Sequence, residues 1–225
     1  MIPLNSIVIT GGGTGLGREL SLQYSSSIDH IILLGRTEAP LMETKELIEN
    51  RGNKATYFIC DLQNLESIKT TVEKIIANYS VYTLINNTGI GTFGPYEEMD
   101  DESIYQMINT NVLGTIFITK YLLPHLKQKP NAKIINIIST AGLRGKVNEV
   151  VYCSSKFAVR GFTESLQKEV EANKVTVTGV YMGGMNTPFW DHSTHIEDKS
   201  RLKAPAEVAK QIKEQDDGKL EIIIS

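Results

Sequence analysis

Short runs of hydrophobic residues alternate with longer amphipathic stretches along the whole chain. The short runs are rich in Ile, Val and Leu, and several of them contain almost no polar residue. Such runs are typical of strands that are covered on both faces. The predicted strands are Ser6–Thr10, His30–Gly35, Ala55–Cys60, Thr83–Asn86, Lys133–Ile138, Val175–Val180 and Leu220–Ile224.

The stretches between these strands have the period of amphipathic helices. Pro205 fits the first turn of the last helix, whereas Pro124 is expected to bend or end the fourth. The predicted helices are Leu16–Tyr24, Leu41–Arg51, Leu65–Asn78, Glu102–Leu126, Tyr152–Ala172 and Pro205–Glu214. Their alternation with strands predicts an α/β fold, a doubly wound parallel sheet with helices on both faces. No repeat or linker interrupts the pattern, so residues 1–225 are expected to form a single domain.

Composition argues against several kinds of partner. The chain has 225 residues, of which 41% are hydrophobic and 22% charged, with a net charge of −3. These values are typical of a globular protein, and the negative charge argues against a nucleic acid or an anionic membrane.

Cys60 and Cys153 lack the spacing of metal ligands and are typical of a reducing compartment. Because residues 1–5 show no signal sequence and no run is long enough to cross a membrane, we expect a cytoplasmic protein.

The first predicted strand leads directly into a glycine-rich turn and then into a helix. The glycines have the spacing Gly11-x-x-x-Gly15-x-Gly17 rather than the stricter Gly-x-Gly-x-x-Gly. Glycines at such a turn let the backbone approach a pyrophosphate, and the N–H groups at the helix N-terminus favour anions. The alternative is a plain tight turn, but the position between the first strand and the first helix favours nucleotide binding.

The end of the second predicted strand indicates which dinucleotide fits. An acidic residue at this point would bind a ribose 2′-hydroxyl, but the sequence Leu34-Gly35-Arg36 offers a guanidinium instead. Arginine pairs with a phosphate through two hydrogen bonds and gains little from a hydroxyl. We therefore predict NADP(H) in preference to NAD(H), with a solvated surface arginine as the alternative. Asp61 and Leu62, after the third strand, are expected to contact the adenine.

Two residues four positions apart in the fifth predicted helix indicate proton transfer. Tyr152 and Lys156 share one face of that helix, with Cβ atoms about 6 Å apart. An ammonium beside a phenol favours the phenolate, and would move the pKa of Tyr152 from about 10 toward the range of a general acid or base. The same spacing occurs by chance in many helices, so the pair alone does not distinguish a catalytic site from an ordinary helix surface.

Several short motifs occur in one order over essentially the whole chain. They are Thr10-Gly-x-x-x-Gly-x-Gly17, Asp61, Asn86-Asn87-Thr88-Gly89, Asn111, Ser139, Tyr152-x-x-x-Lys156 and the turn from Gly183 to Thr187. In these motifs the chain resembles the compact short-chain dehydrogenases/reductases, and in particular NADP-dependent carbonyl and 3-oxoacyl reductases. The resemblance implies a Rossmann-type sheet of seven strands. It also implies an NADP(H)-dependent oxidoreductase that interconverts a carbonyl and a secondary alcohol on a small organic substrate.

The resemblance implies a role for each matching residue. Tyr152 would be the general acid or base, and Ser139 would bind the substrate carbonyl. Lys156 would hold the nicotinamide ribose and lower the pKa of Tyr152, and Asn111 would hold a water that links Lys156 to solvent. Thr88 and Met182 depart from the family pattern, in which Ala and Pro are common at these positions. The expected cofactor contacts are Thr10, Gly11, Gly15, Leu16, Gly17, Arg36, Asp61, Leu62, Asn87, Gly89, Tyr152, Lys156, Met185 and Thr187.

Residues 188–204 are expected to cover the substrate. Phe189 and Trp190 in this segment would pack either on an apolar or aromatic substrate or on the body of the protein. The histidines and acidic residues nearby do not predict a metal site, because loop histidines are usually solvated. These residues are Asp191, His192, His195 and Glu197.

Two other functions use the same kind of fold. A catalytically silent regulator that senses NADP(H) would need only the cofactor contacts, so the complete set of proton-transfer residues argues against it. A sugar-nucleotide epimerase or dehydratase of the extended branch also has Tyr-x-x-x-Lys, but such chains are longer. The resemblance further implies a homo-oligomer, a dimer or tetramer, formed through helices Glu102–Leu126 and Tyr152–Ala172. The identity of the substrate is not predicted, because it depends on the shape of loops.

Overall fold

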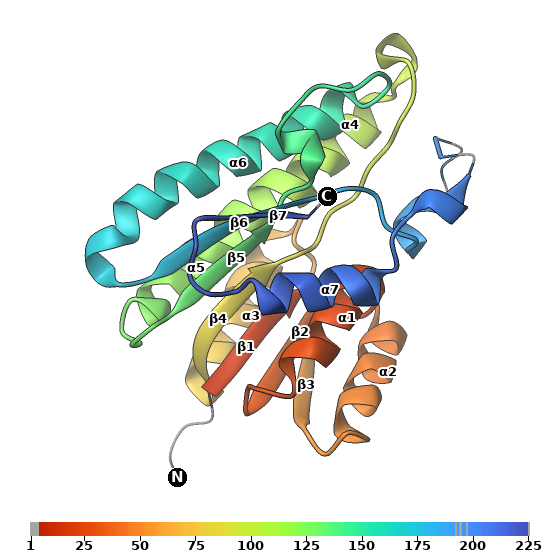
Figure 1. The fold of residues 1–225 in the computed structure, drawn as a ribbon. Coiled ribbons are helices and arrows are strands. Elements are labelled where there is room, and N and C mark those ends of the chain that lie inside the picture. The colour runs from red at the N-terminus through yellow and green to blue at the C-terminus, as the bar shows by residue number, and fades with distance from the viewer. Residues whose placement is uncertain (1–4, 192, 194, 197, 225) are drawn as a thin grey trace.

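The computed structural model describes residues 5–191, 193, 195–196 and 198–224, and Figure 1 shows its fold. The expected absence of a signal sequence falls on residues 1–4, which lie outside the described residues. His192 and Glu197, two members of the disfavoured metal cluster, also lie outside them.

Seven parallel strands form one sheet in the order β3-β2-β1-β4-β5-β6-β7. The strands are β1 (Asn5–Thr10), β2 (His30–Gly35), β3 (Lys54–Ile59), β4 (Ser80–Asn86), β5 (Lys133–Ile137), β6 (Thr176–Met182) and β7 (Glu221–Ile224). The chain moves outward from β1 to β3, returns to place β4 beside β1, and continues outward to β7 (Figure 1). The predicted doubly wound fold and its strands are confirmed. Ligands of such folds bind at the carboxyl ends of the strands where the order reverses, here between β1 and β4.

Helices cover both faces of the sheet (Figure 1). Hydrophobic contacts place α1 (Gly15–Tyr24), α2 (Glu38–Glu49) and α7 (Pro205–Glu214) on one face, and α3 (Leu65–Asn78), α5 (Thr115–Leu126) and α6 (Val150–Val170) on the other. Ile7 and Ile9 of β1 pack in the first layer and Val8 in the second, because side chains alternate along a strand. In the described part of the chain, no helix has the length and hydropathy needed to cross a membrane.

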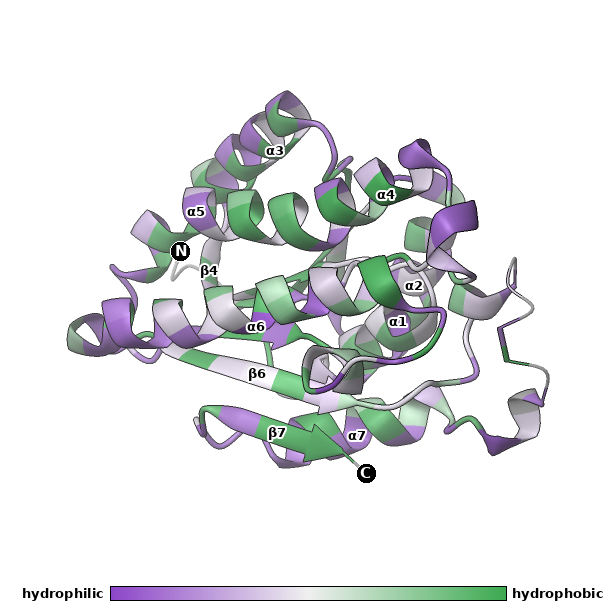
Figure 2. Cartoon of the chain, turned by 90° about the horizontal axis from the view of Figure 1, so that it is seen from above, coloured by the Kyte–Doolittle hydropathy of each residue, from purple (hydrophilic) through white to green (hydrophobic). Residues whose placement is uncertain are grey.

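The predicted helix Glu102–Leu126 consists of three consecutive segments, which corrects the expectation of one regular helix. A π-helical stretch, Ile108–Gly114, separates α4 (Asp101–Met107) from α5. The segments lie end to end in one row (Figure 2). Pro124 does not end the helix, since α5 continues to its predicted last residue. A π-bulge changes the direction of side chains locally and is frequent at functional sites. Here the π-helical stretch contains Asn111.

Candidate active site

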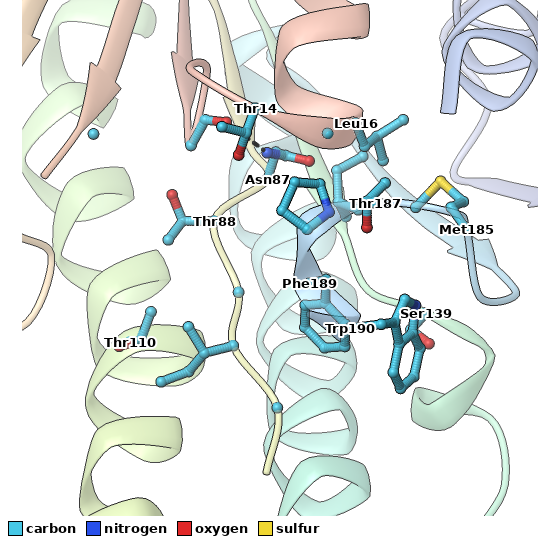
Figure 3. A pocket seen from close by; sticks show the side chains of 18 of the residues that line it. Thr14, Leu16, Asn87, Thr88, Thr110, Ser139, Met185, Thr187, Phe189 and Trp190 are labelled. Atoms are coloured by element: carbon cyan, nitrogen blue, oxygen red, sulfur yellow. Dashed lines mark hydrogen bonds between the residues drawn. The ribbon is translucent and has the colours of Figure 1, made fainter. Parts of the chain in front are cut away.

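The described residues form a cavity of about 780 Å³ beside the carboxyl ends of the strands. Figure 3 shows Thr14 and Leu16, which follow β1, at one end of the view. Ser139, Phe189 and Trp190 lie together at the other end. The cavity therefore connects the glycine turn with the residues predicted to act on the substrate.

Most of the predicted cofactor contacts line this cavity. Thr10 and Gly17 do not line it. The predicted residues that do are Gly11, Gly15, Leu16, Arg36, Asp61, Leu62, Asn87, Gly89, Tyr152, Lys156, Met185 and Thr187.

Positive φ angles shape the glycine turn. Gly11 has a φ of +66° and Gly15 a φ of +51°, a conformation that L side chains rarely adopt. A Cβ atom on Gly11 would lie 3.0 Å from Nδ2 of Asn87, and one on Gly15 would lie 3.2 Å from the side chain of Thr187. A Cβ atom on Gly17 would overlap the carbonyl oxygen of Gly11. The turn is therefore packed tightly against α1 and against the loop after β4.

Thr10 and Asn87 join the ends of β1 and β4. The Oγ1 atom of Thr10 accepts hydrogen bonds from the backbone N–H groups of Asn87 (2.9 Å) and Thr88 (3.0 Å). The side-chain amide of Asn87 donates to the carbonyl oxygen of Thr10 at 3.0 Å. Thr10 is buried, so in this structure it positions the two cavity-lining loops instead of lining the cavity itself.

Two arginines near the glycine turn have different surroundings. Arg18 donates from Nε to the carbonyl oxygen of Gly13 at 3.0 Å and pairs with Glu43 at 2.9 Å. Arg36 is exposed and lines the cavity. Its guanidinium forms no hydrogen bond or ion pair with any residue that the structure describes. It is therefore available to a ligand, whereas Arg18 stabilises the turn.

Tyr152 and Lys156 are both buried in the first two turns of α6. The Nζ atom of Lys156 lies over the Tyr152 ring, 5.7 Å from its centroid, and donates to the carbonyl oxygen of Ile137 at 3.2 Å. A Cβ atom on Gly89 would lie 3.3 Å from this Nζ atom. The predicted pairing on one helix face is confirmed, and the absence of a side chain at Gly89 leaves the ammonium accessible from the cavity.

The expected effect of Lys156 on Tyr152 was wrong for this structure. Burial raises the pKa of Tyr152 above its ordinary value of 10.0, although a hydrogen bond with Ser139 acts in the opposite direction. Burial also lowers the pKa of Lys156 to about 8. Because the ammonium faces the ring and both groups are removed from water, desolvation determines the two pKa values. At neutral pH Tyr152 therefore keeps its proton.

Replacing Lys156 with methionine is expected to raise the free energy of unfolding at pH 7 by about 3 kcal/mol, because a buried ammonium is removed. The lysine pKa is 10.5 in the reference state and about 8 in the fold. Between these values the unfolded chain binds more protons, so wild-type stability rises with pH and the advantage of the variant shrinks. Urea denaturation at pH 7 and pH 10 measures this change. An equal gain in the free energy of unfolding at the two pH values would contradict the prediction.

Ser139 has a strained backbone at the end of β5. Its φ of +108° is rare for a residue with a side chain. Its N–H donates to the carbonyl oxygen of Val180 at 3.3 Å, and its Oγ atom accepts from the N–H of Ala141 at 3.2 Å. Such strain is found at sites where the direction of a side chain matters, and Ser139 lines the cavity together with Tyr152.

Asn111 connects the loop after β4 to α6. Its Oδ1 atom accepts from the N–H of Ile90 at 2.8 Å, and its Nδ2 atom donates to the carbonyl oxygen of Ile90 at 2.9 Å and to Oγ of Ser155 at 3.0 Å. The side chain is fully buried and does not line the cavity. These contacts hold Gly89 beside Lys156, and the role of Asn111 in holding a water stays a prediction.

Sequence reasoning missed two residues near Tyr152. The ring of Phe93 lies 5.4 Å from that of Tyr152, and Glu149 accepts a hydrogen bond from Nε2 of His195 at 3.1 Å when this nitrogen is protonated. The only indication in the sequence was that both residues lie close to a motif along the chain. Phe93 follows Gly89 by four positions, and Glu149 precedes Tyr152 by three. A single aromatic or acidic residue in a loop has no periodicity, so the sequence does not show where its side chain points.

The fold has a cavity at the carboxyl ends of its strands, and comparison with known proteins identifies the family. The family described as short chain dehydrogenase matches residues 5–198. The chain belongs to this family, which confirms the resemblance predicted from its motifs.

Over the aligned residues, individual relatives are about one third identical to this chain or less. A 3-ketodihydrosphingosine reductase from Bacteroides thetaiotaomicron is 35% identical over 187 residues, covering 83% of this chain and 66% of that protein. A sepiapterin reductase from Chlorobaculum tepidum is 28% identical over 192 residues, covering 82% of this chain and 79% of that protein. This chain spans 66% of the length of the Bacteroides thetaiotaomicron reductase. It spans 63% of the length of a fatty acyl-CoA reductase from Acinetobacter baylyi.

Solved structures with the same fold bind different dinucleotides. An actinorhodin polyketide ketoreductase with NADPH has a TM-score of 0.85 at 25% identity, covering 93% of this chain and 89% of that one. A short chain dehydrogenase/reductase from Burkholderia phymatum in complex with NAD has a TM-score of 0.88 at 21% identity, covering 97% and 88% of the two chains. The fold alone therefore does not determine which dinucleotide this chain binds.

Proposed function

We propose that this chain is an NADP(H)-dependent oxidoreductase that interconverts a carbonyl and a secondary alcohol on a small organic substrate. One observation carries the proposal: a single cavity is lined both by the glycine turn before α1 and by Ser139, Tyr152 and Lys156. Such a reaction needs a bound hydride donor and a positioned proton donor. Membership of the short-chain dehydrogenase family and the names of the reductases among its relatives support the same reaction class.

The glycine turn fits a dinucleotide pyrophosphate. Gly11 and Gly15 line the cavity with positive φ angles that side chains rarely adopt, so the backbone itself faces the cavity. Thr14 precedes α1, and its side chain forms no capping hydrogen bond within the described part of the chain. The first N–H groups of α1 are therefore available to an anion, and the positive end of the helix dipole favours it.

In this proposal Tyr152 transfers the proton, and three other residues position the groups around it. The bound nicotinamide supplies or accepts the hydride. In reduction Tyr152 donates its proton to the carbonyl oxygen, and its raised pKa keeps that proton in place until transfer. Ser139 positions the carbonyl oxygen, Lys156 holds the ribose hydroxyls, and Asn111 keeps the loop after β4 against α6. In oxidation Tyr152 accepts the proton instead, so we expect that direction to gain rate as the pH rises.

The exposed guanidinium of Arg36 supports NADP(H) as the preferred cofactor. Replacing Arg36 with aspartate is expected to weaken NADPH binding by about 10–100-fold, since charge-assisted hydrogen bonds to the 2′-phosphate are lost. NADH binding should be maintained or improved, because an acidic side chain binds the 2′-hydroxyl. Fluorescence titration with both cofactors measures the change. A wild-type protein that prefers NADH, or a variant with unaltered NADPH affinity, would contradict this role of Arg36.

A screen for NADPH oxidation over ketones, aldehydes and diketones tests the reaction class, with NADH run in parallel. We expect turnover of at least one carbonyl and a requirement for Tyr152. NADPH binding without any oxidation across the panel would instead support a regulator that senses the cofactor.

We also infer that the protein is cytoplasmic and forms a homo-oligomer. Exposed hydrophobic side chains on the row formed by α4, the π-helical stretch and α5, and on α6, support self-association. Tyr105 on α4 is 66% exposed, and Phe157 on α6 is 43% exposed. Both cysteines, Cys60 and Cys153, are free thiols, which supports a reducing compartment.

A further inference from the structure

Three rings from the segment 188–204, which we propose covers the substrate, line the cavity beside Tyr152. They are Phe189, Trp190 and His195, here called the ring wall. The centroid of Phe189 lies 5.8 Å from that of Tyr152, and Trp190 lies 4.9 Å from Phe189. Figure 3 shows Phe189 and Trp190 close to Ser139. The ring wall therefore flanks the place where a carbonyl would meet Ser139 and Tyr152.

Phe93 supports the ring wall from outside the cavity. It does not line the cavity, yet it stacks on Trp190 at a centroid distance of 5.1 Å and on His195 at 4.7 Å. It also packs edge-on against Tyr152 at 5.4 Å. Because Phe93 belongs to the loop after β4, one side chain holds both the ring wall and the proposed proton donor in place.

Charged residues anchor the ring wall at a second point. Nε2 of His195 lies 3.1 Å from Oε1 of Glu149, and Nζ of Lys146 lies 3.6 Å from Oε2 of the same carboxylate. Glu149 is buried and immediately precedes α6. His195 is thus fixed both by stacking and by this carboxylate. A surface that is already ordered does not have to be ordered by its ligand, which favours binding.

We propose that this end of the cavity selects carbonyl compounds with a flat aromatic ring near the reacting carbonyl. The inference rests on the proposed function and adds the substrate class. Ile90, Ile196 and Leu202 add apolar lining, whereas Lys146 and Glu149 line the same cavity with charge. Aromatic rings stack or pack edge-to-face with other rings, and this geometry gives them binding energy beyond their buried area. A puckered saturated ring of the same carbon count retains the hydrophobic contact and loses that geometry, so the cavity selects flatness in addition to hydrophobicity.

A matched pair of ketones tests the selection. Phenylacetone and cyclohexylacetone have the same carbon skeleton, and in both the carbonyl is separated from the ring by one methylene. Trp190 is the single tryptophan of the chain, so its fluorescence reports directly on the ring wall. With saturating NADP⁺ we expect phenylacetone to change this fluorescence with a Kd about tenfold lower than that of cyclohexylacetone. The ratio of kcat/KM values for reduction should favour phenylacetone in the same way.

Variants show whether the ring wall causes the preference. Phe189→Leu removes a ring that lines the cavity and should remove most of the difference between the two ketones. Phe93→Leu should reduce the difference although Phe93 does not line the cavity; Phe189→Leu provides the test if Phe93→Leu does not fold. Phe58→Leu is the matched control, because Phe58 lies on β3, packs edge-on against Tyr79 and does not line the cavity. It should retain the wild-type preference.

The outcomes separate this inference from the proposed function. Equal Kd values for the two ketones in the wild type, or an unchanged preference in Phe189→Leu, would overturn the selection of flat rings. If the two ketones bound equally and other carbonyl compounds were reduced by NADPH, the selection of flat rings would be rejected and the reductase function would stand. A clear ring preference in the fluorescence titration, without oxidation of NADPH by any carbonyl, would support the ring wall and reject the reductase function.

Discussion

Replacing Tyr152 with phenylalanine is expected to lower kcat by about 10²–10⁴-fold, the contribution of general acid–base catalysis. The substitution removes the hydroxyl and keeps the ring, so the contacts with Phe93 at 5.4 Å and Phe189 at 5.8 Å remain. The Kd for NADPH should therefore stay close to the wild-type value. Steady-state NADPH oxidation and fluorescence titration measure the two quantities separately.

Tyr181→Phe is the matched control for this prediction. Tyr181 is also buried, and burial raises its pKa as well. It lies on β6, packs with Ile138 and Val159, and does not line the cavity. Its variant should therefore retain turnover. Normal turnover in Tyr152→Phe, or an equal loss in both variants, would show that Tyr152 is not the proton donor.

The sequence predicted the parts of the site that depend on local patterns. Apolar runs located every strand, because side chains buried on both faces of a parallel sheet leave a continuous hydrophobic signal. The glycine spacing located the turn before α1, since a turn of this kind tolerates few other residues. The separation of Tyr152 and Lys156 correctly placed both on one face of α6.

Features that depend on tertiary contacts were not predictable in the same way. The spacing of Tyr152 and Lys156 does not reveal that both are buried, and burial reverses the expected shift of the Tyr152 pKa. The π-helical stretch around Asn111 is stabilised by contacts with the loop after β4 and with α6. Phe93 meets the ring wall across a long sequence separation. Each depends on partners that no short window of sequence contains.

Replacing Gly17 with alanine is expected to abolish measurable NADPH binding and to lower the free energy of unfolding by about 1–3 kcal/mol, the usual cost of overpacking. The added Cβ atom would overlap the carbonyl oxygen of Gly11 and lie 2.6 Å from Nδ2 of Asn87. The first neighbour is backbone, and the second is held by its hydrogen bond to Thr10. Neither of these two atoms can make room for the Cβ atom unless the glycine turn moves away from α1.

Gly161→Ala is the control that separates this collision from the general effect of adding a methyl group. Gly161 lies within α6, and beyond its neighbours and its own helical backbone no atom of the described residues is within 4 Å of the position of its Cβ. In a helix this change stabilises by about 0.5–1 kcal/mol, because glycine loses more backbone entropy on folding. Chemical denaturation should therefore show effects of opposite sign for the two variants, and NADPH titration should show loss of binding only for Gly17→Ala. If Gly17→Ala kept both stability and affinity, the close packing of α1 on the turn would not be what positions the pyrophosphate.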